Sequence, residues 1–109
     1  MTMDEVRTYA SVRKWMANVN RYYKLSEEEW DARLRTLADF CRSIDRDPDA
    51  MTAEALNDRA EKIDFMRRLR GFAKERSPDP YGAHDLENVV RSFFIHNGAR
   101  VVTRPYAES

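Results

Sequence analysis

Apolar residues recur three or four positions apart along almost the whole chain, a spacing that places them on one face of successive α-helices. The repeat is clearest near the C-terminus, where Leu86, Val89, Val90, Phe93 and Phe94 occupy positions i, i+3, i+4, i+7 and i+8. No stretch alternates apolar and polar residues for long enough to demand a β-sheet. The sequence therefore predicts an all-α fold.

Local signals divide the chain into four or five helices with short connections. Ser26-Glu27-Glu28-Glu29 is typical of a capping box that opens a helix, Thr52 is a candidate cap, Ser77-Pro78-Asp79-Pro80 predicts a stop, and Asn97-Gly98 predicts a left-handed C-cap. The expected helices cover about residues 6–19, 26–44, 53–61, 63–74 and 83–97. The fourth either joins the third or follows a kink near Lys62. The expected architecture is a small helical bundle.

The length of 109 residues suits one domain, and 35% charged with 42% hydrophobic residues is typical of a folded protein. We expect a helical domain over residues 1–102 and a linker or cloning remnant over residues 103–109. The N-terminus lacks the basic and apolar blocks of a secretory signal, and no apolar run is long enough for a membrane span. These features predict a cytoplasmic protein that does not bind a membrane.

Few residues have the chemistry of a catalytic or metal site. Cys41 is the single cysteine, and His84 and His96 lie 12 positions apart, too far for one metal ion or one proton relay. The acidic run from Asp45 to Asp49 lacks the glycine and glutamate that a calcium loop needs, so it is interpreted as a capping loop. No nucleophile motif or phosphate-binding glycine loop is present. We expect no catalytic residue, no metal and no cofactor in this chain.

Net charge is zero, with 19 basic and 19 acidic residues, but the charges are unevenly distributed. Residues 1–24 carry +3, residues 25–61 carry −6 and residues 62–109 carry +3. Several basic and amide side chains have the chemistry that holds phosphates and contacts base edges. They are Arg67, Arg68, Arg70, Lys74, Asn88 and Arg91. The alternative interpretation is an ordinary solvated helix face.

Short segments in a fixed order also resemble a known family. They are Trp15, Leu25-Ser26, Leu37-Ala38-Asp39-Phe40-Cys41-Arg42, the turn Asp47-Pro48-Asp49-Ala50-Met51-Thr52, Phe72, and Val90-Arg91-Ser92-Phe93-Phe94-Ile95-His96-Asn97-Gly98. Over about residues 12–102 the chain resembles the SAM-like N-terminal core-binding domain of tyrosine recombinases, the phage-integrase family, and especially its archaeal members.

The resemblance implies a module that clamps one face of a recombination half-site on double-stranded DNA. A separate C-terminal domain, with an Arg, Lys, His, Arg, His/Trp set and a tyrosine nucleophile, would break and rejoin the strand. That catalytic domain and other recombinase protomers on DNA are the expected partners. By position, the DNA-facing surface would come from the exposed faces of the helix capped by Ser26 and of the last helix. The residues are Asp31, Arg33 and Arg35 on the former and His84, Asn88 and Arg91 on the latter.

The connection before Ser26 adds Tyr22 and Lys24, with Tyr23 beside them, as further candidate DNA contacts. Packing against the bundle is the alternative role for the tyrosines. A second hypothesis for the whole chain is a helical protein-interaction domain of an unrelated regulator, in which the acidic middle segment meets a basic partner.

Overall fold

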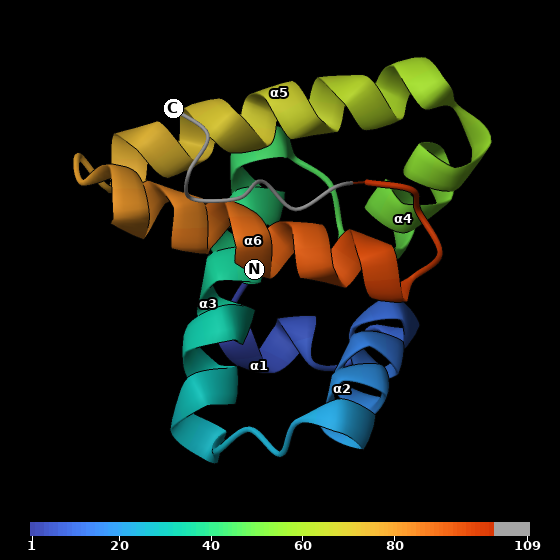
Figure 1. Ribbon diagram of the computed structural model, residues 1–109. Coiled ribbons are helices and arrows are strands. Elements are labelled where there is room, and N and C mark those ends of the chain that lie inside the picture. The colour runs from blue at the N-terminus through green and yellow to red at the C-terminus, as the bar shows by residue number, and fades with distance from the viewer. Residues whose placement is uncertain (102–109) are drawn as a thin grey trace.

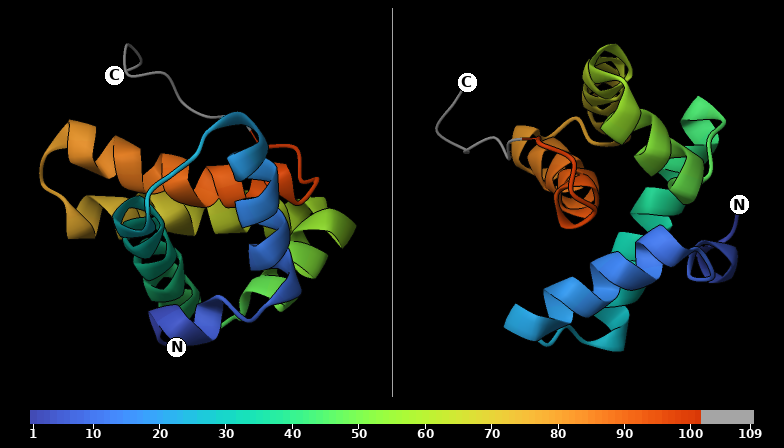
Figure 2. Two further views of the ribbon diagram at one scale, coloured as in Figure 1. Left: turned by 90° about the horizontal axis from the view of Figure 1, so that it is seen from below. Right: turned by 90° about the vertical axis from the view of Figure 1, so that its right-hand side faces the viewer.

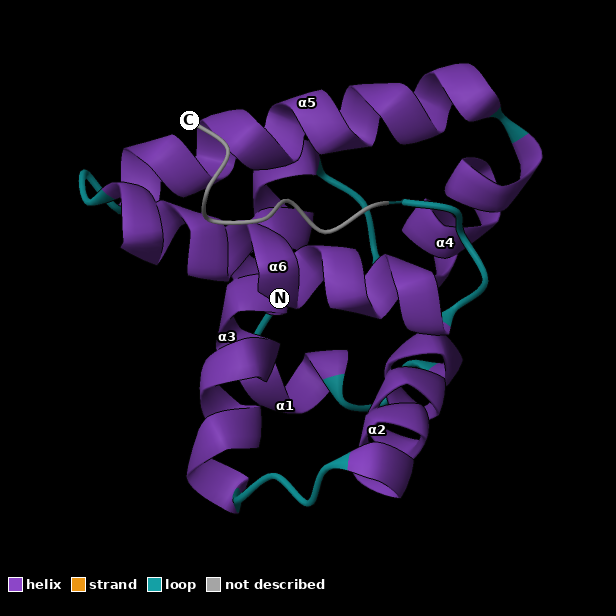
Figure 3. Cartoon of the chain, viewed as in Figure 1, coloured by secondary structure: helices purple, strands orange, loops and turns teal. Residues whose placement is uncertain are grey.

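The computed structural model describes residues 1–101, and these residues form six α-helices with no strand among them (Figure 1, Figure 3). The helices are α1 (Met3–Val6), α2 (Ala10–Tyr22), α3 (Glu27–Ile44), α4 (Pro48–Asn57), α5 (Arg59–Arg76) and α6 (Pro80–His96). The predicted all-α class is confirmed. The structure has one helix more than the four or five predicted: the first predicted helix, residues 6–19, corresponds to α2, and α1 precedes it. The segment expected to be a linker or cloning remnant, residues 103–109, lies outside the described residues.

The break between α1 and α2 has a cause that is distant in the sequence. Tyr9 adopts an extended conformation and offers no side-chain cap to α2. The cap instead comes from α4, where the Asp49 carboxylate accepts the backbone N–H of Ser11 at 2.9 Å. A carboxylate at this position satisfies a free amide of the first turn and suits the positive end of the helix dipole.

The predicted start of α3 is confirmed in detail. The Ser26 hydroxyl accepts the N–H of Glu29 at 3.1 Å, and the Glu29 carboxylate accepts the N–H of Ser26 at 3.3 Å. The helix ends at Ile44, as expected, with Asp45 in the left-handed region at φ 56°.

The boundaries of α4 and α5 differ from the prediction. Asp47, and not Thr52, caps α4 by accepting the N–H of Ala50 at 2.7 Å, which confirms a capping role for the acidic loop. Thr52 is buried inside the helix. The break between α4 and α5 falls at Asp58, whose carboxylate accepts the N–H groups of Ala60 and Glu61.

The C-terminal boundary of α6 follows the sequence prediction. Gly98 has φ +91°, and the Ala99 N–H donates to the Phe94 carbonyl at 3.0 Å while the Gly98 N–H donates to the Ile95 carbonyl at 3.0 Å. This pair of bonds is a Schellman motif, which favours glycine because only glycine adopts positive φ without strain.

Two pairs of long helices are arranged crosswise. α5 and α6 run antiparallel side by side, while α2 and α3 descend from them and are joined by the loop at the far end (Figure 1, Figure 2). α1 packs on α3, and both α2 and α3 pack on α6. No helix among residues 1–101 combines the length and the apolar character needed to cross a bilayer.

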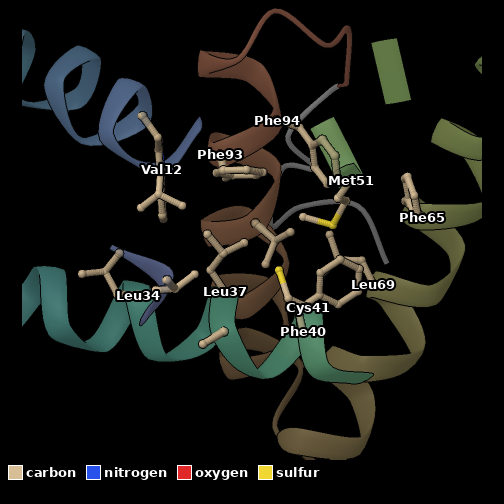
Figure 4. Packing of buried hydrophobic residues seen from close by; sticks show 14 of the residues in the cluster. Val12, Leu34, Leu37, Phe40, Cys41, Met51, Phe65, Leu69, Phe93 and Phe94 are labelled. Carbon is tan, nitrogen blue, oxygen red and sulfur yellow. The ribbon is translucent and has the colours of Figure 1, made fainter. Parts of the chain in front are cut away.

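The core forms where these helices meet. Figure 4 shows side chains of α2, α3, α5 and α6 converging, with Met51 of α4 among them. Trp15 is completely buried and makes edge-to-face contacts with Trp30, at 5.2 Å between ring centroids, and with Phe93, at 5.6 Å. Its indole therefore ties α2 to both α3 and α6.

Candidate nucleic-acid interface

Three side-chain hydrogen bonds join α2 to the C-terminal half of α6. Trp15 Nε1 donates to Ser92 Oγ at 3.1 Å, and Asn18 Nδ2 donates to the His96 carbonyl at 3.1 Å. Asn97 Nδ2 donates to the Ser11 carbonyl at 3.1 Å. These bonds fix the register of the two helices, and we call this contact the α2–α6 seam.

A pocket of about 550 Å³ lies where the C-terminal end of α2 meets α6, beside the loop that leads into α3. Its lining residues come from three helices and one loop: Val19, Tyr22, Tyr23, Leu25, Arg33, Ser92 and His96. We call it the tyrosine pocket. Its volume falls in the range of small-molecule sites in proteins.

The two tyrosines of this pocket are open to solvent. Tyr22 is the last residue of α2, and Tyr23 leaves the helix in an extended conformation while its N–H still donates to the Val19 carbonyl at 2.9 Å. Tyr22 is 74% exposed and Tyr23 70% exposed. Neither ring stacks on another aromatic ring in the described part of the chain. Their faces are therefore available to a ligand.

Arg33 gives the tyrosine pocket a positive charge that no lining carboxylate offsets. None of the described lining residues is acidic. Glu29 lies one turn before Arg33, but its carboxylate accepts the Ser26 N–H and forms no ion pair with Arg33 within 4.0 Å. The two other pockets described for residues 1–101 contain acidic residues, Asp39 and Glu75 in one and Asp45 and Asp47 in the other. The tyrosine pocket is thus the one of these three that suits an anion.

The surface of α2 extends this positive charge. Residues 6–26 contain five basic residues and no acidic residue. Four of the five are exposed and form no ion pair with any carboxylate of the described chain. They are Arg13, Lys14, Arg21 and Lys24, and we call them the α2 ridge. Arg21 and Lys24 flank the two tyrosines in sequence, so the ridge ends next to residues that line the tyrosine pocket.

The expected exposure of His84 and Arg91 on α6 is wrong. Both are buried, at 9% and 5% exposed. The Arg91 guanidinium donates from Nη2 to Glu87 Oε1 at 3.3 Å and from Nη1 to Met66 Sδ at 3.5 Å. Glu87 is itself 6% exposed. Arg91 is therefore a member of a buried ion pair, because the face of α6 that the sequence suggested was free packs against α5.

The remaining predicted residues do not form one surface. Arg33 lines the tyrosine pocket, whereas Arg35 is exposed on another side of α3, since residues two apart in a helix face different directions. Asp31 is paired with Arg7 at 3.3 Å. Asn88 is partly buried, and its Oδ1 has no hydrogen-bond partner among the described residues. Of the predicted contacts, the structure brings together Tyr22 and Arg33, with Lys24 in the adjoining loop.

The basic residues of α5 are partly neutralised within their own helix. Arg67 and Arg68 both pair with Asp64, the latter at 2.9 Å between Arg68 Nε and Asp64 Oδ2. The hydrogen bond from Arg67 holds the pKa of the Asp64 carboxyl below its usual value, and the charge of Arg68 acts in the same direction. Arg59, Arg70 and Lys74 of α5 are exposed and form no ion pair in the described chain, so α5 differs from α2 chiefly in having acidic residues, Glu61, Asp64 and Glu75, among its cations.

Sequence reasoning did not single out Ser92 or His96 as ligand contacts, and of the α2 ridge it named only Lys24. The ridge could have been predicted, because residues 6–26 contain five basic residues and no acidic residue. Nothing local marks Ser92 and His96, because they reach the tyrosine pocket only through the docking of α6 on α2. Among the described residues, no group of three or more His, Cys, Asp or Glu side chains is placed to hold a metal ion.

Comparisons of the chain with protein-family models, with curated proteins and with solved structures give no match.

Proposed function

We propose that the chain is a DNA-binding module that holds the phosphate backbone with the α2 ridge and Arg33. The observation that carries this proposal is the set of exposed cations on α2 that lack a carboxylate partner in the described chain. A cation already paired with a carboxylate gains little from a phosphate, whereas an unpaired one displaces condensed counterions from DNA.

The ridge has a suitable shape for this contact. Lys14 and Arg21 are seven residues apart, which places them on the same side of α2 and about 10 Å apart along its axis. Lys24 and Arg33 continue the positive surface past the end of the helix. Such a row follows a phosphate backbone and carries no sequence preference by itself.

Salt dependence tests the proposal. If the four ridge residues and Arg33 each contact a phosphate of duplex DNA, log K falls with log salt with a slope of about −4.5. Raising salt from 50 to 200 mM then weakens binding roughly 500-fold. Fluorescence anisotropy with a labelled duplex measures this slope. A chain that fails to bind duplex DNA at 50 mM salt does not have the proposed function.

A matched pair of variants locates the contact. Lys14→Gln/Arg21→Gln/Lys24→Gln removes three charges from the ridge, and Arg59→Gln/Arg70→Gln/Lys74→Gln removes three exposed charges from α5. The ridge variant is expected to reduce the salt slope by about 2.7, while the α5 variant changes it little. Equal effects of the two variants would show that net charge, and not the α2 ridge, determines binding.

The finer proposal is that this module is the core-binding part of a tyrosine recombinase. Its support is the ordered resemblance over about residues 12–102, together with the all-α fold. On this proposal a separate domain supplies the catalytic Arg, His and Tyr residues, and this chain grips the half-site. A coding sequence that continues beyond residue 109 into such a set supports it, and a stop codon at that point removes it.

The second candidate, a protein-interaction domain, is favoured by a different observation. Leu56 on α4 and Ile63 on α5 are 52% and 56% exposed, although both are large and apolar. On this alternative, Leu56→Glu abolishes partner binding and duplex DNA does not bind at any salt concentration.

A further inference from the structure

We propose that the tyrosine pocket binds one unpaired nucleotide of a nucleic acid, with the base on the tyrosines and its phosphate on Arg33 and His96. This inference rests on the proposed function, since it names what the pocket adds to the phosphate contacts of the α2 ridge. It concerns a single-stranded end, gap or unpaired base, which the ridge alone does not distinguish from duplex.

The aromatic wall of the pocket suits a base. Tyr22 and Tyr23 present side chains that are mostly exposed and make no ring–ring contact within the described chain. Val19 and Leu25 supply an apolar surface beside them. Every base has a π-face, so an exposed aromatic side chain binds an unstacked base with little regard to its identity.

Three other residues that line the pocket, Arg33, Ser92 and His96, are polar and suit a phosphate. Arg33 offers a guanidinium without a carboxylate partner in the described residues. The Ser92 hydroxyl accepts the Trp15 indole N–H and donates no hydrogen bond within residues 1–101, so its hydrogen is available to an anion. The backbone of His96 is held in place because its carbonyl accepts the Asn18 amide, and His96 lines the same pocket.

An intact duplex does not contact both the tyrosines and the polar residues of the pocket. Its bases are stacked on one another and expose only their edges in the grooves. A base that is already unpaired offers its face without the cost of opening the helix. Because Arg21 and Lys24 are next in sequence to the tyrosines, the proposal has the phosphates of one strand on the α2 ridge and an unpaired nucleotide of that strand in the pocket.

The experiment compares three labelled probes with the full chain by anisotropy: a blunt duplex, the same duplex with a short thymidine overhang, and a short oligothymidylate. The parent chain is expected to bind the overhang at least tenfold more tightly than the blunt duplex. Tyr22→Ala/Tyr23→Ala is expected to weaken binding of the overhang about 5- to 150-fold. It leaves blunt-duplex binding within about twofold, because rigid stacked bases do not use the pocket.

Two controls isolate the pocket. Tyr81→Ala removes a tyrosine that is 67% exposed at the start of α6, away from the pocket, and is expected to leave binding of the overhang unchanged. Arg33→Gln is expected to lower the salt slope for the oligothymidylate by about 0.7. Arg35→Gln, on the other side of α3, is expected to leave that slope unchanged.

The outcomes separate this inference from the proposed function. If blunt duplex binds with the predicted salt slope but the overhang adds nothing, or if the tyrosine variant retains overhang binding, the pocket inference is overturned and the function stands. If no DNA probe binds, both the pocket inference and the proposed function are overturned. If a phosphotyrosine peptide binds the pocket more tightly than the overhang, the occupant is a peptide and the inference is overturned.

Discussion

Replacing Arg91 tests whether this residue serves the fold or a ligand. Its guanidinium is 5% exposed and pairs with Glu87, itself 6% exposed, at 3.3 Å. Arg91→Met retains the apolar stem of the side chain but removes the charge that faces the buried carboxylate. Breaking a buried ion pair from one side costs about 3–5 kcal/mol. For a domain of this size that is a fifth or more of the whole free energy of unfolding, which is about 5–15 kcal/mol.

Urea unfolding measures this loss. With an m value of about 2 kcal/mol/M, a loss of 4 kcal/mol lowers the urea midpoint by roughly 2 M. Fluorescence of the buried Trp15 and Trp30 reports the transition. Arg70→Met, an exposed arginine on α5 with no ion pair in the described chain, is the matched control and is expected to change stability by less than about 0.5 kcal/mol.

A double variant completes the test. Glu87→Gln/Arg91→Met removes the buried negative charge together with its partner, so it is expected to be more stable than Arg91→Met alone. If Arg91→Met unfolds at the same urea concentration as Arg70→Met, the buried-pair interpretation is refuted. A folded Arg91→Met variant that loses DNA binding would restore Arg91 as a ligand contact.

Three further predictions concern stability, reactivity and pH dependence. Ser26→Ala removes the acceptor of the Glu29 N–H and is expected to cost about 1 kcal/mol in urea unfolding, whereas Ser43→Ala, which removes a bond to a carbonyl inside the same helix, is expected to cost less. Burial raises the pKa of the Cys41 thiol to about 12, so iodoacetamide at pH 8.5 is expected to alkylate it far more slowly in the native chain than in urea. Because folding favours the protonated thiol, its contribution to stability is constant below about pH 9 and falls as pH rises towards 12. Cys41→Ala is expected to lack that part of the fall, and an equal fall in both chains would contradict it.

The helix periodicity and the local caps were sufficient to predict most of the fold. The Ser26 capping box and the Gly98 C-cap depend on residues within one or two turns, so a sequence reveals them. The break before α2 does not, because its cap is Asp49, which lies 38 positions from Ser11. Thr52 was a misleading candidate, since Asp47 five residues earlier already satisfies the first turn of α4.

The candidate site was only partly predictable for a similar reason. Tyr22, Lys24 and Arg33 were recognisable from their chemistry and their position near a helix boundary. Arg91 has the same chemistry as Arg33, but Glu87 stands four residues before it, and packing on α5 buries the pair. A polar residue on an amphipathic helix is exposed only if no other helix covers that face.

The α2–α6 seam also has a consequence for the order of folding. Its bonds join residues 77 to 86 positions apart, and closing a loop of about 80 residues costs on the order of 4 kcal/mol in chain entropy. The α5–α6 hairpin, with its short connection, forms without that cost. We therefore expect α2 to dock last, so hydrogen exchange should show its amides opening at a lower free energy than those of α5 and α6. Because the tyrosine pocket exists only once the seam has closed, a bound ligand would protect α2 most.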